Sequence, residues 1–161
     1  VVEMRGNINT RLKKLKNSNI DGIILAKAGL RRMEMDSLIT QNLSVESFVP
    51  SPGQGVLCIE CLSQHSEIMS KIKKIVHPNT EICVSAERIF AAQMDGDCMS
   101  PIGAHATIQK DLISITGFVA TADGTRFIRN KIEGNKNNYK DLSTKLSNLF
   151  IKMGSKGMLK C

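Results

Sequence analysis

The feature that most constrains the fold is a change in hydrophobic spacing after Gly103. In three runs (104–108, 112–120 and 126–132) apolar and polar residues alternate, a spacing typical of half-buried β-strands. Asp123-Gly124, between the second and third runs, is a strong signal for a tight hairpin turn. We therefore predict three short antiparallel strands in this part of the chain.

Helical spacing flanks these strands on both sides. Thr80 can cap a helix whose apolar face is formed by Ile82, Ala86, Ile89, Phe90 and Gln93. The closing helix has apolar residues at Leu142, Leu146, Leu149, Phe150 and Met153. Residues 77–161 are therefore expected to form a small α+β domain, with helices packed on a three-stranded antiparallel sheet.

The earlier part of the chain follows an α/β pattern. A helix is expected from Ile8 to Lys16, capped by Asn7 or Asn9, and a second helix over 28–35. The short apolar run 23–26 between them is typical of a strand that is buried on both faces. Because strand and helix alternate, residues 1–50 are interpreted as part of an α/β domain with parallel strands, and Val1–Met4 as an apparent strand whose beginning lies elsewhere.

A stretch rich in proline and glycine, 48–55, is the best candidate for a hinge between lobes. It is followed by an expected strand over 56–61 and an expected helix over 67–76. We predict that residues 51–76 form a separate hinge segment with a strand and a helix, between the domains 1–50 and 77–161.

Basic residues follow the expected strand ends of the first domain. Arg5 lies just before the first helix and Arg11 one turn into it, while Arg31 and Arg32 follow the strand over 23–26. A helix N-terminus offers free backbone N–H groups, and guanidinium groups pair with carboxylates and phosphates, so the pattern predicts an anion site. Two solvated surface arginines would be the plainer interpretation, but the net charge of +7 also favours an anionic partner.

Cys98 lies where one helical pattern ends. Gly96 is expected to stop the helix and Pro101 prevents it from resuming, so the thiol is presented on a short loop, where reactive side chains often lie. A small buried hydrophobic residue is the alternative interpretation of a lone cysteine. Five cysteines without a secretory signal indicate reduced, cytosolic thiols. The pair Cys58 and Cys61 has metal-ligand spacing, but in an extended run the two would point to opposite faces, so no metal site is predicted.

Five motifs, taken together and in order, resemble the hydroxymethylbilane synthase family, also called porphobilinogen deaminase. They are Arg5-Gly6-Asn7 with Thr10-Arg11, Ile24-Leu25-Ala26 with Ala28-Gly29-Leu30-Arg31-Arg32, Pro52-Gly53-Gln54-Gly55, Ala86-Glu87-Arg88, and Asp95-Gly96-Asp97-Cys98 with Pro101-Ile102-Gly103. The likeness extends to about Gly134. It implies a partial periplasmic-binding-protein-like α/β lobe, joined by a hinge strand to the C-terminal domain.

The resemblance implies a cytoplasmic transferase of tetrapyrrole, porphyrin and heme biosynthesis. In this family, four porphobilinogen units are deaminated and joined head to tail to give 1-hydroxymethylbilane. The growing chain is anchored to a dipyrromethane cofactor, which a thioether links to the cysteine that matches Cys98. Arginines matching Arg5, Arg11 and Arg32 bind the acetate and propionate side chains, with Gln54 and Gly96 beside the same cleft.

The chain departs from the family in two respects. Asp97 stands where the family usually has a second glycine, and a carboxylate beside a thiol disfavours the reactive thiolate. The family protein is also about twice as long, and the resemblance places its catalytic carboxylate in the N-terminal part. We therefore expect no catalytic residue in this chain, no activity of the chain alone, and association with that N-terminal part or with another copy.

A basic module that binds nucleic acid or another anion without catalysis is the alternative. Its support is the charge and the lysine clusters Lys13-Lys14-Lys16 and Lys71-Lys73-Lys74. These lysines lie on expected amphipathic helices, where they usually form the solvated face, and stacking aromatics are scarce. Neither a nucleic acid nor a membrane is therefore predicted as a partner.

Overall fold

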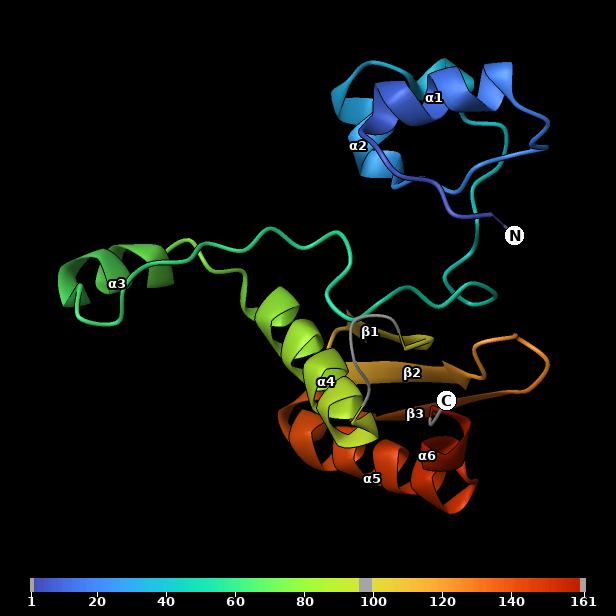
Figure 1. Ribbon diagram of the computed structural model, residues 1–161. Helices are drawn as coiled ribbons and strands as arrows, with labels where there is room; N and C mark the ends of the chain where they lie inside the picture. The colour runs from blue at the N-terminus through green and yellow to red at the C-terminus, as the bar shows by residue number, and fades with distance from the viewer. Residues whose placement is uncertain (1, 96–99, 160–161) are drawn as a thin grey trace. The chain divides into compact units, whose positions relative to one another are not determined.

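The computed structural model describes residues 2–95 and 100–159 of the chain (Figure 1). Gly96 and Cys98, two of the predicted site residues, therefore lie outside the described residues. The chain divides into two compact units, Val1–Leu43 and Ser44–Cys161. Each unit is described by itself below.

The first unit is helical. It contains α1 (Ile8–Asn17), the short α2 (Lys27–Arg32) and the 3-10 helix η1 (Asp36–Leu38). Leu30 is the only buried hydrophobic residue among the described residues of this unit, and no residue of α1 is buried. The unit therefore has little hydrophobic core of its own.

The strands predicted before Gly103 are not formed. Residues 2–4, 23–26 and 56–61 are not part of any strand, and every strand in the described chain lies after Pro101. A strand needs a second strand to accept and donate its backbone hydrogen bonds, and no described segment pairs with these three. The predicted burial of these apolar runs is also wrong for the described chain: Leu57 is 90% exposed and Ile24 is 64% exposed.

The second unit contains the predicted three-stranded antiparallel sheet, in the order β1-β2-β3. The strands are β1 (Ile102–Gln109), β2 (Leu112–Ala120) and β3 (Phe127–Asn135). Ala106 lies opposite Ile115 in the first pair, and Ile115 lies opposite Ile132 in the second. The alternating pattern thus predicted the three strands correctly.

The Asp123-Gly124 turn connects β2 to β3 as predicted. Gly124 has a positive φ of 71°, and the Asp123 carboxylate accepts hydrogen bonds from the Thr121 hydroxyl at 2.6 Å and from the Thr125 backbone N–H at 3.1 Å. These hydrogen bonds, that from the Thr121 side chain first, lower the pKa of Asp123. The aspartate therefore stabilises the turn in its ionised form.

Helices α4 (Pro78–Met94) and α5 (Tyr139–Lys152) pack against one face of this sheet and against each other (Figure 1). The aromatic rings of Phe90 in α4 and Phe150 in α5 meet between the two helices, where they lie edge to face with centroids 4.9 Å apart. The remaining helices of the unit are α3 (Ser66–Lys73), η2 (Lys136–Asn138) and α6 (Ser155–Met158). None of the helices in the described chain combines the length and the apolar content that are needed to cross a bilayer.

Candidate functional site

Two of the predicted anion-binding residues lie at the N-terminal end of α1: Arg5 just before the helix, and Arg11 within it. The Arg11 guanidinium donates from Nε to the Gly6 carbonyl at 2.7 Å, and the Lys14 ammonium donates to the Arg5 carbonyl at 3.1 Å. Arg5 itself pairs through Nε with the Glu3 carboxylate at 2.6 Å, and its side chain is 86% exposed. Three cations therefore gather at the N-terminal end of α1.

The local sequence explains this geometry. Gly6 has a φ of 120°, a conformation that side chains rarely adopt, and a Cβ placed there would lie 2.8 Å from Thr10 Cγ2. Asn7 is the N-cap, because its side-chain oxygen accepts hydrogen bonds from the backbone N–H and the hydroxyl of Thr10, both at 2.9 Å. The first turn of α1 contains no acidic residue. The turn thus presents positive charge at the positive end of the helix dipole, an arrangement suited to an anion.

Arg32 lies at the C-terminal end of α2 and is exposed. Its neighbour Arg31 is held through Nε by Asp36 at 3.2 Å. The Arg32 side chain has no hydrogen bond or ion pair within the part of the chain that the structure describes, so it is available to a ligand. The structure brings Arg5 and Arg11 to one turn and leaves Arg32 without a bond to either.

Gln54 belongs to the second unit and is exposed. Its backbone N–H donates to the Ser51 carbonyl at 3.0 Å, which closes a tight turn through Pro52 and Gly53. This turn is fastened to the rest of the unit by Glu87, a residue that the sequence places only in a motif and not on the buried face of its helix. The available signal was a charged residue directly after Ala86 and three residues before Phe90, both on the predicted apolar face of the helix.

The helix before Cys98 ends one residue earlier than the position of Gly96 suggested. Met94 is the last residue of α4, and Asp95 takes the left-handed conformation, with φ 58° and ψ 33°. Aspartate tolerates this conformation because its short polar side chain can bond locally. The described chain continues at Ser100 and enters β1 at Ile102, while the loop predicted to present Cys98 lies outside the described residues.

Cys83 differs from the other described cysteines in its surroundings. Burial, and then the charge of Glu87, raise the pKa of the Cys83 thiol above its ordinary value, whereas Cys58 is exposed. A raised pKa leaves less thiolate at any given pH, so Cys83 should react with iodoacetamide several-fold more slowly than Cys58 at pH 8. Timed alkylation followed by peptide mass spectrometry measures both rates. In guanidinium chloride the two rates should converge, and a difference that persists there would contradict the structural cause.

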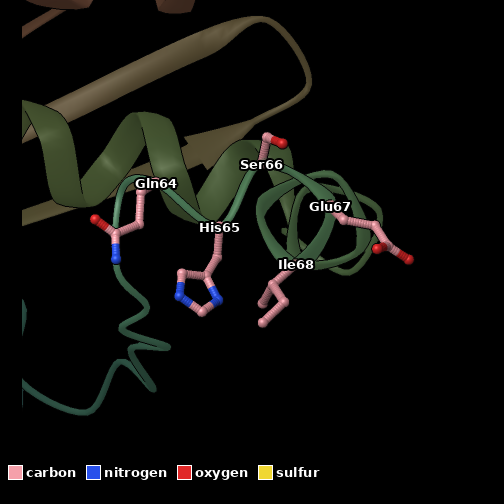
Figure 2. Close-up of a pocket in the computed structure, with 5 residues that line it drawn as sticks. All are labelled: Gln64, His65, Ser66, Glu67 and Ile68. Carbon is pink, nitrogen blue, oxygen red and sulfur yellow. The ribbon is translucent and has the colours of Figure 1, made fainter.

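An open hollow at the start of α3 is not part of this site. It is lined by five consecutive residues, 64–68, and Figure 2 shows the side chains of Gln64, Ser66 and Glu67 pointing in different directions. No predicted site residue lines it. Among the described residues there is also no group of three or more His, Cys, Asp and Glu side chains that could hold a metal ion.

Two family models match the chain. Residues 1–70 match the model described as "Porphobilinogen deaminase, dipyromethane cofactor binding domain", and residues 81–152 match "Porphobilinogen deaminase, C-terminal domain". Arg5, Arg11, Arg32 and Gln54 fall within the first match, and Cys98 falls within the second.

Curated relatives agree with these matches. The chain is 41% identical to the porphobilinogen deaminase of Campylobacter hominis over 99% of its own length and 52% of that protein. It is 38% identical to the porphobilinogen deaminase of Pelotomaculum thermopropionicum, over 99% of the chain and 51% of the relative. It is 41% identical to one from Clostridium botulinum, over 94% of the chain and 51% of the relative. The chain thus spans about half the length of the curated relatives it matches. With both family models and these relatives in agreement, the chain belongs to the porphobilinogen deaminase family.

Proposed function

We propose that this chain forms the later part of a hydroxymethylbilane synthase, a cytoplasmic transferase that deaminates four porphobilinogen units and joins them head to tail into 1-hydroxymethylbilane. The observation that carries the proposal is the turn with Arg5, Arg11 and Lys14, which lies inside the match to the cofactor-binding domain. When bound, a dipyrromethane supplies the pyrrole end to which successive units are joined. The chain's own residues would bind and tether it.

The described residues fit such a group. Each pyrrole carries an acetate and a propionate, and planar guanidinium groups pair with carboxylates through two parallel hydrogen bonds. The one carboxylate paired at the turn is that of Glu3, which is 73% exposed, and an exposed ion pair contributes little to stability. A ligand carboxylate can therefore replace Glu3 on Arg5, and Arg32 is available for another.

Cys98 is the proposed point of covalent attachment, with Gly96 beside it. The thiol would add to the methylene carbon that becomes electron-poor when ammonia leaves; a carbon–sulfur bond forms and the thiol proton is released. The thioether then holds the primer through every cycle, so sulfur supplies tethering and high effective concentration. Catalytic proton transfer is assigned to the part of the relatives that this chain does not match.

The proposed division is into residues 1–50, which bind the anionic side chains, a hinge segment 51–76, and a domain 77–161 that includes the cysteine. The hinge segment exposes large apolar side chains, which supports the interpretation that part of the folded unit is missing. These side chains are Val56, Leu57, Ile59, Leu62, Ile75 and Val76. Apolar surface of this extent is typical of an interaction site. We propose that it binds the remaining part of a porphobilinogen deaminase, or another copy of this chain, and that the chain alone is inactive.

The proposal is tested by complementation. The chain is mixed with the half of the Campylobacter hominis relative that it does not match, and porphobilinogen is added. We expect a dipyrrole adduct on Cys98, detected by intact mass and a pyrrole colour reaction, and formation of 1-hydroxymethylbilane by the mixture only.

Two variants make this test specific. Cys98→Ser should abolish the adduct and the product, while Cys83→Ser, which alters a thiol of α4 outside the proposed site and outside the hinge segment, should leave both unchanged. Product formed by the chain alone would contradict the proposed incompleteness. A mixture without adduct, or an adduct that survives Cys98→Ser, would contradict the assigned function.

A further inference from the structure

Glu87 is a buried carboxylate that serves two separate backbone segments. It lies in α4, is 5% exposed, and accepts hydrogen bonds from the Gly53 N–H at 2.7 Å and from the Ala106 N–H at 2.8 Å, one on each oxygen. The imidazole of His105 lies 3.7 Å away through Nδ1. A buried charge is costly unless its oxygens are hydrogen-bonded, and here both are. A buried position of α4 is therefore occupied by a hydrogen-bond acceptor for backbone groups that lie outside the helix.

One of these groups belongs to a free edge of the sheet. β1 pairs with β2 on one side only, so alternate N–H groups of β1 point away from the sheet. The Ala104 N–H donates to the Pro50 carbonyl at 2.9 Å, and the Ala106 N–H donates to Glu87. The segment around Pro50 and the Glu87 carboxylate thus cover the edge that would otherwise be unpaired.

The other group belongs to the turn that carries Gln54. The hydrogen bond from Gln54 N–H to Ser51, Pro52 at the second position, and Gly53 at the third with φ 73° are the pattern of a type II turn. The approach is close: a Cβ on Gly103 would lie 2.8 Å from the Val49 carbonyl oxygen and 3.2 Å from that of Pro50. Glycine at 103 therefore permits the Val49-Pro50 backbone to lie against β1, and the hydrogen bond from the Gly53 N–H to Glu87 holds the following turn in place.

We infer that Glu87 is a positioning residue, whose carboxylate latches the Ser51–Gln54 turn onto the edge of β1 and so sets where Gln54 stands. β1 begins at Ile102, four residues after Cys98 in the chain, so the latch ties the Gln54 turn to the strand that directly follows the proposed tether. The part of this inference that assigns Gln54 to the pyrrole chain rests on the proposed function. The latch itself does not.

Amide hydrogen exchange of the whole chain, followed by NMR, tests the latch. In the unaltered chain the Gly53 amide should be protected although it lies in a loop. In Glu87→Gln the neutral amide can accept only one of the two N–H groups, so exchange of Gly53 or Ala106 should become about tenfold faster or more, because a hydrogen bond to a charged group changes an opening equilibrium by that factor. The amides of Ile113 and Ile115 in the centre of the sheet should be unaffected.

Two controls separate positioning from a general loss of stability. Glu81→Gln makes the same chemical change on an exposed residue of the same helix and should leave Gly53 protected. Ile113→Val weakens the core without touching the latch and should accelerate exchange throughout the sheet. Gly103→Ala, which keeps Glu87 but obstructs docking of the turn, should release Gly53 as Glu87→Gln does. An unprotected Gly53 in the unaltered chain would overturn the inference even if no variant folded, as would a Gly53 that changes only in step with Ile113.

The functional part has its own readout. In the complemented mixture with porphobilinogen, the side-chain amide resonance of Gln54 should shift, and the shift should be lost in Glu87→Gln but kept in Glu81→Gln. If Gly53 protection depends on Glu87 while Gln54 never responds, the latch stands and the assignment of Gln54 to the pyrrole chain is wrong. If Gln54 responds equally in both variants, Glu87 does not position it.

Discussion

Replacing Phe90 by alanine should lower the free energy of unfolding of the second unit by about 3–5 kcal/mol. Phe90 has no exposed surface, and its ring lies edge to face with Phe150 and against the backbone of Gly117. The substitution removes a large apolar side chain from the one place where α4, α5 and β2 meet, and these elements cannot close the cavity without losing their own contacts. Because a domain is stabilised by only about 5–15 kcal/mol in total, the variant should be close to unfolding at 37 °C.

Urea denaturation followed by circular dichroism measures this loss. Phe127→Ala is the matched control, because that ring is 66% exposed and stacks only on Phe118, with centroids 5.9 Å apart. It should cost less than about 1.5 kcal/mol. Equal losses in the two variants would show that Phe90 is not at the centre of the core.

Gly117→Ala should destabilise the same unit by about 1–3 kcal/mol although it adds a single methyl group. A Cβ on Gly117 would lie 2.6 Å from Phe90 Cζ and 3.1 Å from Phe150 Cζ, closer than carbon atoms approach one another. Both rings are fully buried and cannot turn away into solvent. Glycine at this position of β2 is therefore required by the two rings that pack over it.

A double-mutant cycle identifies the collision as the cause. Phe90→Leu withdraws the ring that the new methyl group meets, so Phe90→Leu with Gly117→Ala should cost less than the sum of the single changes. Gly157→Ala is the control, since nothing lies within 4 Å of a Cβ there, and it should be neutral or stabilising by up to about 1 kcal/mol. Additive losses in the cycle would contradict the proposed contact.

The second unit was largely predictable. The predicted range 112–120 coincides with β2. The range 104–108 is shorter than β1 at both ends, and the range 126–132 begins one residue before β3 and ends three residues before its end. Alternation and the Asp123-Gly124 turn act between residues that are close in sequence, so they can be recognised without knowing the fold. The short helix α6, which follows Gly154, carried no such pattern and was not predicted.

The candidate site was predictable only in part. The arginine turn could be anticipated because its bonds are local: Arg11 to Gly6 and Thr10 to Asn7 span five residues or fewer. The sequence could not predict whether residues 23–26 and 56–61 form strands, because a strand needs a pairing partner and no nearby residue encodes one. The same apolar run is a buried strand in one context and exposed chain in another.

Amino-acid spacing by itself determined the three strands of the sheet, the two helices that cover them and the polar turn before α1. Each of these depends on side chains that are close together in the sequence. The five motifs also determined the family. Only the tertiary structure decided that Glu87 is an internal acceptor, since the two N–H groups that it binds lie 34 and 19 residues away along the chain. A carboxylate on a helix is ordinarily solvated, and it becomes a latch only when folding brings backbone donors from two other segments to its oxygens.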